Sequence, residues 1–299
     1  MDVGLHEAGR SALGSKAAPA LEGRQCADSL LVKHIGEYVT NRQNNDGGYT
    51  FVQSTESNAQ DTYYGLAILG FLNAPFPNVE KTIRWLHEFV PESLYHHYYV
   101  AKALELCGED TAEKVKAFLL SRVGSKRQSA TIDIHVEAAS EFVTTSIVTE
   151  LANTASVKID HEKTIGWLLR YQNNDGGFGV HGYSNLNSTY HAVASLFNVG
   201  YPIKSLSGVL GYVRACEKPS GGFTVIPSSS IPYMEHVYYG ASTLDLLGQH
   251  LRFPRTTGQF VLRCQNANGG FARTDLGIST FEDTFFAVDI LRKIGTLKR

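Results

Sequence analysis

The stretch Gln172–Phe178, QNNDGGF, is one of four copies of a phrase that decides the fold class. The other copies begin at Gln43 (QNNDGGY), Glu217 (EKPSGGF) and Gln265 (QNANGGF). Each has a glutamine or glutamate, three further residues, a Gly-Gly pair and then an aromatic residue. The pairs recur about every 45 residues, with room for two degenerate copies between the first and the second, as in repeat architectures. The sequence therefore predicts six units.

Each unit has the same order of elements: a polar-faced helix, the Gly-Gly turn or its remnant, and a more apolar helix. Apolar residues at helical spacing in the second helix indicate burial on more than one face, which places these helices in an inner ring. The inner helices are expected to start near Asp61, His96, Glu141, Ser188, His236 and Asp283. Their polar partners are expected to cover residues 27–42, 78–90, 110–122, 160–171, 203–216 and 254–264.

The sequence thus predicts an all-α (α/α)6 toroid of six helix hairpins around a central apolar cavity, formed as one domain by residues 25–299. Glycine is needed at the turns because it adopts positive φ and lets two backbones approach closely. Residues 1–24 are rich in Gly, Ala and Ser and are expected to be a flexible lead-in. An open solenoid that binds peptides is the alternative, although the terminal repeats carry the full phrase and lack the polar face of a cap.

Composition excludes several classes of protein. The chain has 299 residues, 43% of them hydrophobic, so it can bury a sizeable core. With 27 Lys and Arg against 29 Asp and Glu, a nucleic-acid-binding surface is not expected. Four widely spaced cysteines favour a reducing compartment. No apolar run is long enough for a transmembrane segment and no signal peptide is evident, so we expect a cytoplasmic protein.

Over about residues 27–297, the Gly-Gly-aromatic repeats resemble the α-α toroid superfamily of protein prenyltransferase β subunits and class II terpene cyclases of the squalene-hopene type. The aromatic residue is Phe or Tyr and never Trp, so the resemblance is nearer to the prenyltransferase β-subunit branch. It implies a central cavity for an isoprenoid or isoprenyl diphosphate. It also implies a helical partner subunit, as in the heterodimeric prenyltransferases.

Protein prenyltransferases use a zinc site, and the resemblance shows where its ligands would fall. An Asp and a Cys two positions apart correspond to His236 and Tyr238, and a His on the following inner helix corresponds to Phe286. Zinc stabilises the thiolate nucleophile, so this ligand set does not retain the usual chemistry. The sequence also lacks a DDxxD motif; Mg²⁺ is kept as a candidate cofactor.

The diphosphate pocket of the family is partly matched. His181 lies three residues after the Phe of its repeat, where the family places a phosphate-binding His, and Tyr239 matches the pocket Tyr. Arg273 could supply a cation from the next repeat, in a different register. The alternative is that His181 and Arg273 are solvated loop residues.

Aromatic residues of the inner helices are the expected lining of the cavity, where they would steer an isoprenoid chain and stabilise carbocations. His236 is a further candidate for contact with the substrate. The candidate aromatic residues are Tyr63, Tyr98, Tyr190 and Phe285.

A class II cyclase needs a carboxylic acid that stays neutral in an apolar cavity and protonates an alkene or epoxide. The stretch Thr280–Thr284 matches the DxDD-like acid motif in its last two acids, Glu282 and Asp283, while the leading Asp is replaced by Thr280. The alternative is that Asp283 caps a helix, as Asp61 would in its own repeat.

Four polar residues occupy equivalent starts of inner helices that become consecutive if the ring closes. They are Asp61, His96, His236 and Asp283, weak candidates for a metal site or a proton relay. Adjacent helix axes lie roughly 8–10 Å apart, so simultaneous ligation requires inward-leaning side chains. The alternative is helix capping with isolated hydrogen bonds.

Three functions remain open at this point. The first is a prenyltransferase-β-like protein that binds, and transfers without zinc, an isoprenyl group, with Tyr239 in the catalytic pocket. The second is a cyclase that uses Glu282 and Asp283 as acid. The third is a non-catalytic protein that binds prenyl lipids or serves as a scaffold.

Overall fold

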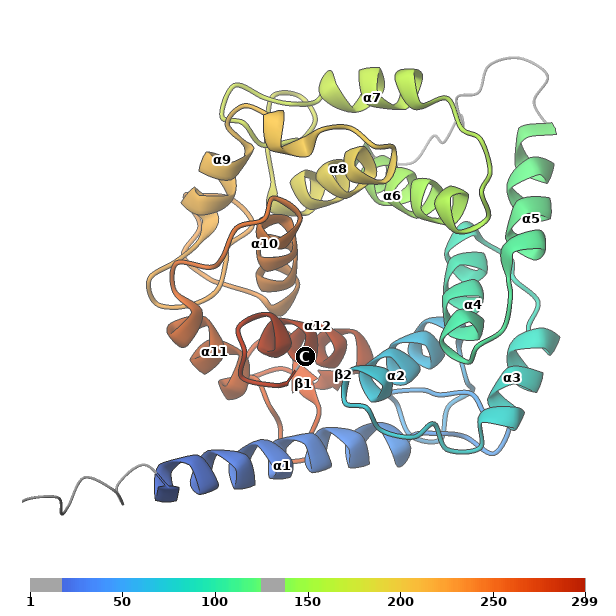
Figure 1. Cartoon of the computed structure of the whole chain (residues 1–299), viewed down its shortest axis with the longest axis vertical. Helices are drawn as coiled ribbons and strands as arrows, with labels where there is room; N and C mark the ends of the chain where they lie inside the picture. The colour runs from blue at the N-terminus through green and yellow to red at the C-terminus, as the bar shows by residue number, and fades with distance from the viewer. Residues whose placement is uncertain (1–17, 125–137, 299) are drawn as a thin grey trace, which may run out of the picture.

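A ring of helix pairs surrounds a central opening in the computed structural model, which describes residues 18–124 and 138–298 (Figure 1). In these residues twelve α-helices alternate along the chain between an inner and an outer ring. This confirms the predicted (α/α)6 toroid. The inner helices are α2 (Ala59–Phe71), α4 (Leu94–Leu106), α6 (Ala138–Thr154), α8 (Leu186–Asn198), α10 (Met234–Leu246) and α12 (Phe281–Lys293).

The outer helices cover the ring from outside. They are α1 (Ala18–Thr40), α3 (Val79–Glu88), α5 (Ala112–Gly124), α7 (His161–Leu169), α9 (Val209–Cys216) and α11 (Pro254–Arg263). A 3-10 turn, η1 (Ile203–Ser205), precedes α9, and the two-residue strands β1 (Phe271–Ala272) and β2 (Ser279–Thr280) pair antiparallel before α12.

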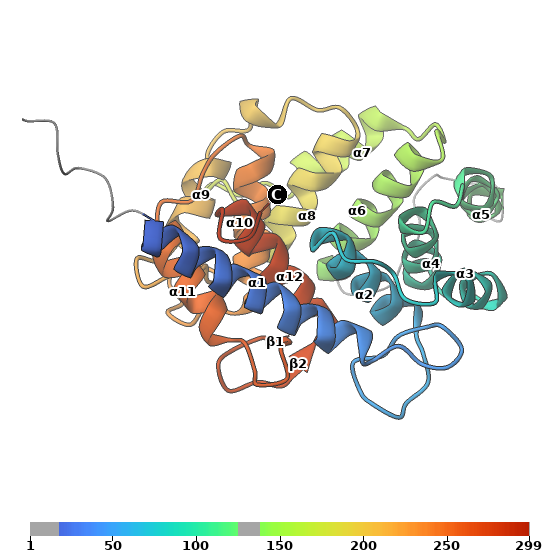
Figure 2. The same ribbon diagram turned by 60° about the horizontal axis from the view of Figure 1, so that its bottom comes forward.

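The ring is closed. Each inner helix packs against the next, and α12 packs against α2, which lies at the other end of the chain. Tyr38 of α1 contacts Phe281 of α12 edge-to-face, with ring centroids 5.5 Å apart. Figure 2 shows α1 running in front of α11 and α12 of the last repeat, so the first helix completes the outer ring. An open solenoid is therefore excluded.

Each Gly-Gly turn touches the next outer helix. A Cβ atom at Gly176 (φ +86°) would overlap the backbone of Gly208, directly before α9. A Cβ atom at Gly269 (φ +90°) would overlap the backbone carbonyl of His34 in α1. The same contact that joins consecutive repeats therefore also joins the last repeat to the first helix.

The other residues of the phrase complete this joint. Gln43 Nε2 donates to the carbonyl of Pro77 at 2.8 Å, and Gln172 Nε2 donates to that of Ser207 at 2.9 Å. In the repeat that has a glutamate, the direction is reversed, and Glu217 accepts from the backbone N–H of Phe253 at 3.2 Å. The four aromatic residues that follow the glycines are fully buried: Tyr49, Phe178, Phe223 and Phe271.

Two details differ from the sequence-based prediction, and a third expected feature lies outside the described residues. Helix α1 begins at Ala18, within the expected lead-in 1–24, because Ala, Leu, Glu and Arg favour a helix and Pro19 stands in its first turn. Residues 203–216 are not one helix, because Gly208 (φ +79°) turns the chain against Gly176 before α9 starts. The remnant of the turn expected in repeat three falls on residues 125–137, outside the described residues.

The hydrophobic core has two parts. A large cluster of buried side chains extends around most of the ring. A separate, smaller cluster fills the sector of α4, α5 and α6, where neither repeat has a Gly-Gly turn among its described residues. Its buried members are Ala101, Val115, Leu119, Ile147, Leu151, Ala152 and Ala155.

Gly269→Ala tests the closure of the ring. Both Gly269 and Gly295 have positive φ, but nothing lies within 4 Å of a Cβ at Gly295 (φ +75°). We expect Gly295→Ala to lower the free energy of unfolding by about 1 kcal/mol for the backbone conformation alone. Gly269→Ala should cost about 1–3 kcal/mol more, because the methyl group pushes α1 away from the last repeat. Urea unfolding measures both, and equal losses would show that this contact does not hold the ring closed.

Candidate active site

A pocket of about 570 Å³ opens at the end of the ring where the inner helices begin. All inner helices point the same way, so this end collects the residues of their first turns and of the connections before them. Phe51 and Phe286 form part of its wall. Its charged and hydroxyl groups include Asp61, Glu235, Tyr239, Arg273, Glu282 and Asp283.

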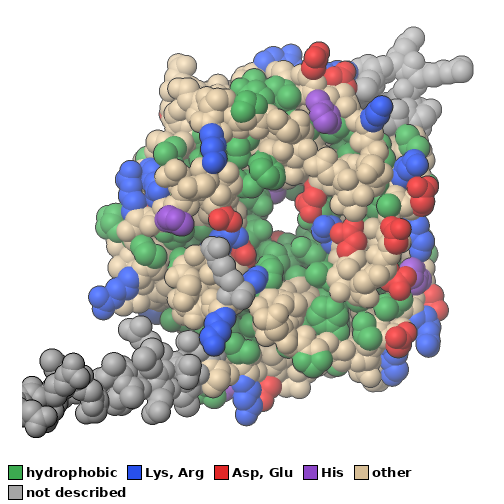
Figure 3. Space-filling view, viewed as in Figure 1, with side chains coloured by type: hydrophobic (Ala, Val, Ile, Leu, Met, Phe, Trp, Pro, Cys, Tyr) green, Lys and Arg blue, Asp and Glu red, His purple; other side chains and the backbone are tan. Residues whose placement is uncertain are grey.

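Aromatic rings continue from this pocket along the wall of the central opening. Tyr63 contacts both Tyr98 and Phe285, with ring centroids 6.2 and 6.1 Å apart. Tyr238 contacts Phe285 and Tyr190, each at 5.9 Å. The structure thus brings the four predicted lining residues, Tyr63, Tyr98, Tyr190 and Phe285, into one set of touching rings. Figure 3 shows the central opening and apolar side chains around it.

Charged residues at the opposite end of the ring are paired with one another. Lys102 Nζ lies 2.9 Å from Glu105 and 3.3 Å from Glu150, and the Tyr98 hydroxyl donates to Glu150 at 3.1 Å. Asp289 and Lys293 form a further ion pair near the end of α12. Both charge signs are visible at the edge of the opening in Figure 3. The cavity therefore has an aromatic middle and a polar group at each end.

Glu282 lies where the pocket meets the aromatic wall. Burial raises the pKa of its carboxyl group, and nearby Glu235 and Asp61 raise it further. The Tyr64 hydroxyl, which donates to Glu282 Oε1 at 3.0 Å, opposes this rise because it stabilises the carboxylate. Glu282 is thus a carboxyl group that holds its proton more tightly than usual beside apolar rings.

Asp283 and Asp61 have equivalent positions and similar surroundings. Burial raises the pKa of Asp283 to about 6, against a hydrogen bond from Thr280, and burial also raises the pKa of Asp61. Neither residue is the helix cap, because the N-cap side chains are Thr280 and Asn58, which accept from the backbone N–H of Asp283 and Asp61. The aspartate carboxylates in turn accept hydrogen bonds from the side chains of those two caps.

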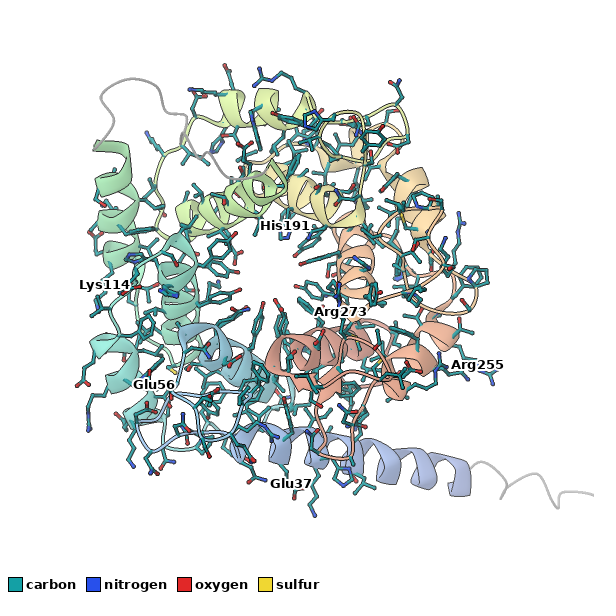
Figure 4. All side chains as sticks on the ribbon, turned by 180° about the vertical axis from the view of Figure 1, so that it is seen from behind. Glu37, Glu56, Lys114, His191, Arg255 and Arg273 are labelled. Carbon is teal, nitrogen blue, oxygen red and sulfur yellow. The ribbon has the colours of Figure 1, made fainter. Side chains whose placement is uncertain are left out.

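Arg273 reaches the pocket, but its charge is matched. Its guanidinium donates to Glu235 through Nε, at 2.9 and 3.0 Å from the two carboxylate oxygens, and through Nη2. It also lies 4.3 Å from the centre of the Tyr233 ring. Figure 4 shows Arg273 at the inner edge of the ring. Sequence reasoning missed Glu235, which turns the expected free cation into one half of an ion pair.

The positions of the family's zinc ligands do not fit zinc. The Tyr238 and Phe286 rings stack on each other with centroids 4.4 Å apart, and His236 is buried, with Nε2 3.9 Å from Glu235. His96 packs against Phe89, so it does not join Asp61, His236 and Asp283. Asp61 and Asp283 line the same pocket, but the structure does not bring all four candidate residues together. Among described residues, no three His, Cys, Asp or Glu side chains are placed to hold a metal ion.

His181 is not part of the pocket. It lies at positive φ (+54°) in the connection before α8, and its side chain is exposed. The pocket walls contain no contribution from this connection. The structure therefore does not bring His181 together with Tyr239 and Arg273.

His191 is a polar residue of the inner helix α8. Its Nδ1 is buried and has no hydrogen-bond partner, and burial lowers its pKa to about 3. The ring lies between Tyr190 and Tyr239, with centroids 4.9 and 5.4 Å away. Figure 4 shows it at the inner side of α8. His191 is thus a neutral imidazole beside the cavity.

Residues 16–89 and 140–299 match the prenyltransferase alpha-alpha toroid domain family. The chain belongs to this family. Protein farnesyltransferase subunit beta of Pisum sativum is 31% identical over 121 residues, which is 37% of this chain and only 28% of the pea protein.

Two solved structures share the fold. Candida albicans protein geranylgeranyltransferase-I complexed with GGPP superposes with a TM-score of 0.71 at 14% identity, over 87% of this chain and 90% of that one. The type II terpene cyclase MstE from Scytonema superposes with a TM-score of 0.55 at 11% identity, over 90% and 97%. Both comparisons therefore show the same toroidal fold.

No helix in residues 18–124 and 138–298 combines the length and the apolar character that crossing a membrane requires.

The raised pKa of Asp283 predicts a pH dependence of stability. A carboxyl group whose pKa rises on folding stabilises the folded state when protonated, so this contribution is complete below pH 3.8 and is lost as the pH rises through about 6. Asp283→Asn, which keeps an acceptor for Thr280, should remove roughly 1–3 kcal/mol of this pH dependence between pH 4 and 7. Urea unfolding at several pH values measures it. Asp275→Asn, an exposed carboxyl before α12, is the control. If the unfolding free energy of Asp283→Asn changed with pH as it does in the wild type, the raised pKa of Asp283 would be contradicted.

Proposed function

We propose that the chain binds a polyene isoprenoid in its aromatic cavity and that Glu282 protonates one of the double bonds to start a cyclisation. The observation that carries this proposal is the position of Glu282, a buried carboxyl group of raised pKa at the junction of the pocket and the aromatic wall. Such a group keeps its proton at a pH where an ordinary glutamate has lost it, which suits a general acid.

The proton balance of the step is simple. The π electrons of the alkene form a new C–H bond with the carboxyl proton, which leaves a carbocation and the Glu282 carboxylate. A second double bond attacks the cation, and a ring closes. The rings of Tyr63, Tyr238 and Phe285 offer their negative faces to the positive charge along this path. The Tyr64 hydroxyl stabilises the carboxylate once the proton has left.

The last step requires loss of a proton from the cyclised cation. His191 of α8 is suited to accept it, because burial keeps its imidazole neutral. Its ring contacts Tyr239, which lines the pocket. Proton return from His191 to Glu282 through solvent would complete the cycle, with no group lost from the substrate.

Transfer of a prenyl group from a diphosphate has less support. A diphosphate needs uncompensated positive charge, yet Arg273 is paired with Glu235 and His181 lies outside the pocket. The pocket also holds the carboxyl groups of Asp61, Glu282 and Asp283. These acids repel a diphosphate unless they are protonated or a cation is added.

Glu282→Gln tests the proposed acid. With farnesol, geranylgeraniol or geranylgeranyl diphosphate as substrate, we expect the wild type to form cyclic products without release of pyrophosphate. The variant should lose this turnover by about 100-fold or more, because the amide has no acidic proton. Product formation is followed by gas chromatography with mass spectrometry, and pyrophosphate by a coupled assay.

Glu37→Gln, an exposed position on α1 visible in Figure 4, is the matched control and should retain full turnover. Pyrophosphate release that requires an added acceptor would replace the proposal with prenyl transfer. Tight lipid binding without any product would show that the chain only binds the lipid, and it would refute the role of Glu282 as an acid.

Tyr64→Phe tests how the proton is held. Removing the hydroxyl takes away the hydrogen bond that lowers the pKa of Glu282, so the pKa should rise further. Because the protonated carboxyl is the active form, activity should persist to higher pH, and the alkaline limb of the pH–rate profile should move upward. A limb that moves downward or stays in place would show that a different group donates the proton.

A further inference from the structure

Large apolar side chains are strongly exposed on the connections that lead into the inner helices. Leu276 and Ile278, before α12, are 95% and 75% exposed, and Tyr183, before α8, is 80% exposed. Similar residues stand on three further connections, before α2, α4 and α10. We name the set Val52, Val90, Tyr183, Ile231, Leu276 and Ile278 the apolar rim.

The apolar rim lies on one face of the ring. Every one of its connections ends where an inner helix begins, which is also the end where the pocket opens. Figure 2 shows two of these connections, the one between α1 and α2 and the one between β1 and β2, projecting from the lower side of the ring. The rim therefore surrounds the entrance to the cavity.

The opposite connections carry apolar residues as well, but they are covered. Phe76, Val157, Tyr201 and Leu251 lie on four of them, and all four pack partly buried against the core clusters. In the described residues none of these connections presents a strongly exposed large apolar side chain. The exposure of the rim is thus not a general property of the loops of this fold.

The rim connections have little charge. Residues 224–233, TVIPSSSIPY, contain no charged residue. Between the Gly-Gly-aromatic phrase and the inner helix, and in residues 89–93 before α4, the charged residues are Glu56, Glu92, Arg273 and Asp275. Arg273 is paired with Glu235. The other three, Glu56, Glu92 and Asp275, are acidic. This face of the ring therefore matches a neutral membrane surface better than an anionic one.

We propose that the apolar rim inserts into the surface of a neutral lipid bilayer and that the isoprenoid passes from the membrane through the rim into the cavity. Its side chains stand on separate connections around an opening. Lipid can surround such isolated tips, whereas a protein partner needs a continuous, closely packed apolar patch. If the entrance lies against the bilayer, a water-insoluble ligand can enter the cavity without passing through water.

This inference rests on the lipid-binding part of the proposed function and not on the acid chemistry of Glu282. Membrane binding can be measured without turnover, and turnover can be measured with the substrate dispersed in detergent. The two proposals can therefore fail separately.

The test compares two double variants of the full chain in flotation with phosphatidylcholine vesicles. Leu276→Ser with Ile278→Ser removes two rim side chains, whereas Leu210→Ser with Leu262→Ser removes two exposed leucines from α9 and α11 on the outer ring. We expect the rim variant to bind vesicles at least about tenfold more weakly than the wild type, because two apolar side chains no longer leave water. The control variant should bind like the wild type. Adding anionic phosphatidylglycerol should not strengthen binding.

A second readout links the rim to delivery of the ligand. The rim variant should lose uptake of fluorescent geranylgeraniol from vesicles but keep uptake of the same lipid from detergent micelles. Equal vesicle binding by both variants, or no binding by the wild type, would overturn the proposal. A dimer in light scattering that the rim substitutions dissolve would instead assign this surface to a second copy of the chain. Binding that rises steeply with anionic lipid would also refute it.

Discussion

The architecture depends on the contact between each glycine turn and the backbone of the following outer helix. A side chain at Gly176 or Gly269 would occupy the place of that backbone, so the spacing between repeats is set by the absence of a Cβ atom. The glutamine beside the turn fixes the direction of the contact by bonding to the next repeat. Because Gly269 meets His34 of α1, a local rule applied repeatedly produces a closed ring.

Closure determines where chemistry can occur. Since all inner helices start at one end, their capping groups and first-turn acids gather there, while their aromatic residues face one another in the middle. Burial raises the pKa of Asp61, Glu282 and Asp283 in this region, and neighbouring carboxylates raise those of Glu282 and Asp283 further. Such surroundings favour a carboxyl group that keeps its proton. Once the proton has been donated, they favour a positively charged group beside the resulting carboxylate. They disfavour a free dianion.

The repeated phrase was sufficient to predict the ring, because its period and glycines report a contact present in every described copy. Glu282, Asp283 and Tyr239, which the family motifs singled out, line one pocket. What the sequence did not reveal depends on how the connections fold. Arg273 meets Glu235, 38 residues earlier, only because the connection before α12 passes over the start of α10. The His96 side chain turns toward Phe89, a local packing choice that the regular spacing does not report.

The separate small core of α4, α5 and α6 has a consequence for motion. In this sector the hairpins lack the glycine joint among their described residues, and the buried side chains form their own cluster. A sector with a small hydrophobic core of its own can open as a separate cooperative unit, at a lower free energy than the large core. Backbone amides of these helices should therefore exchange with deuterium before those of α10 and α12, and widening of the bore for a bulky ring system would begin there.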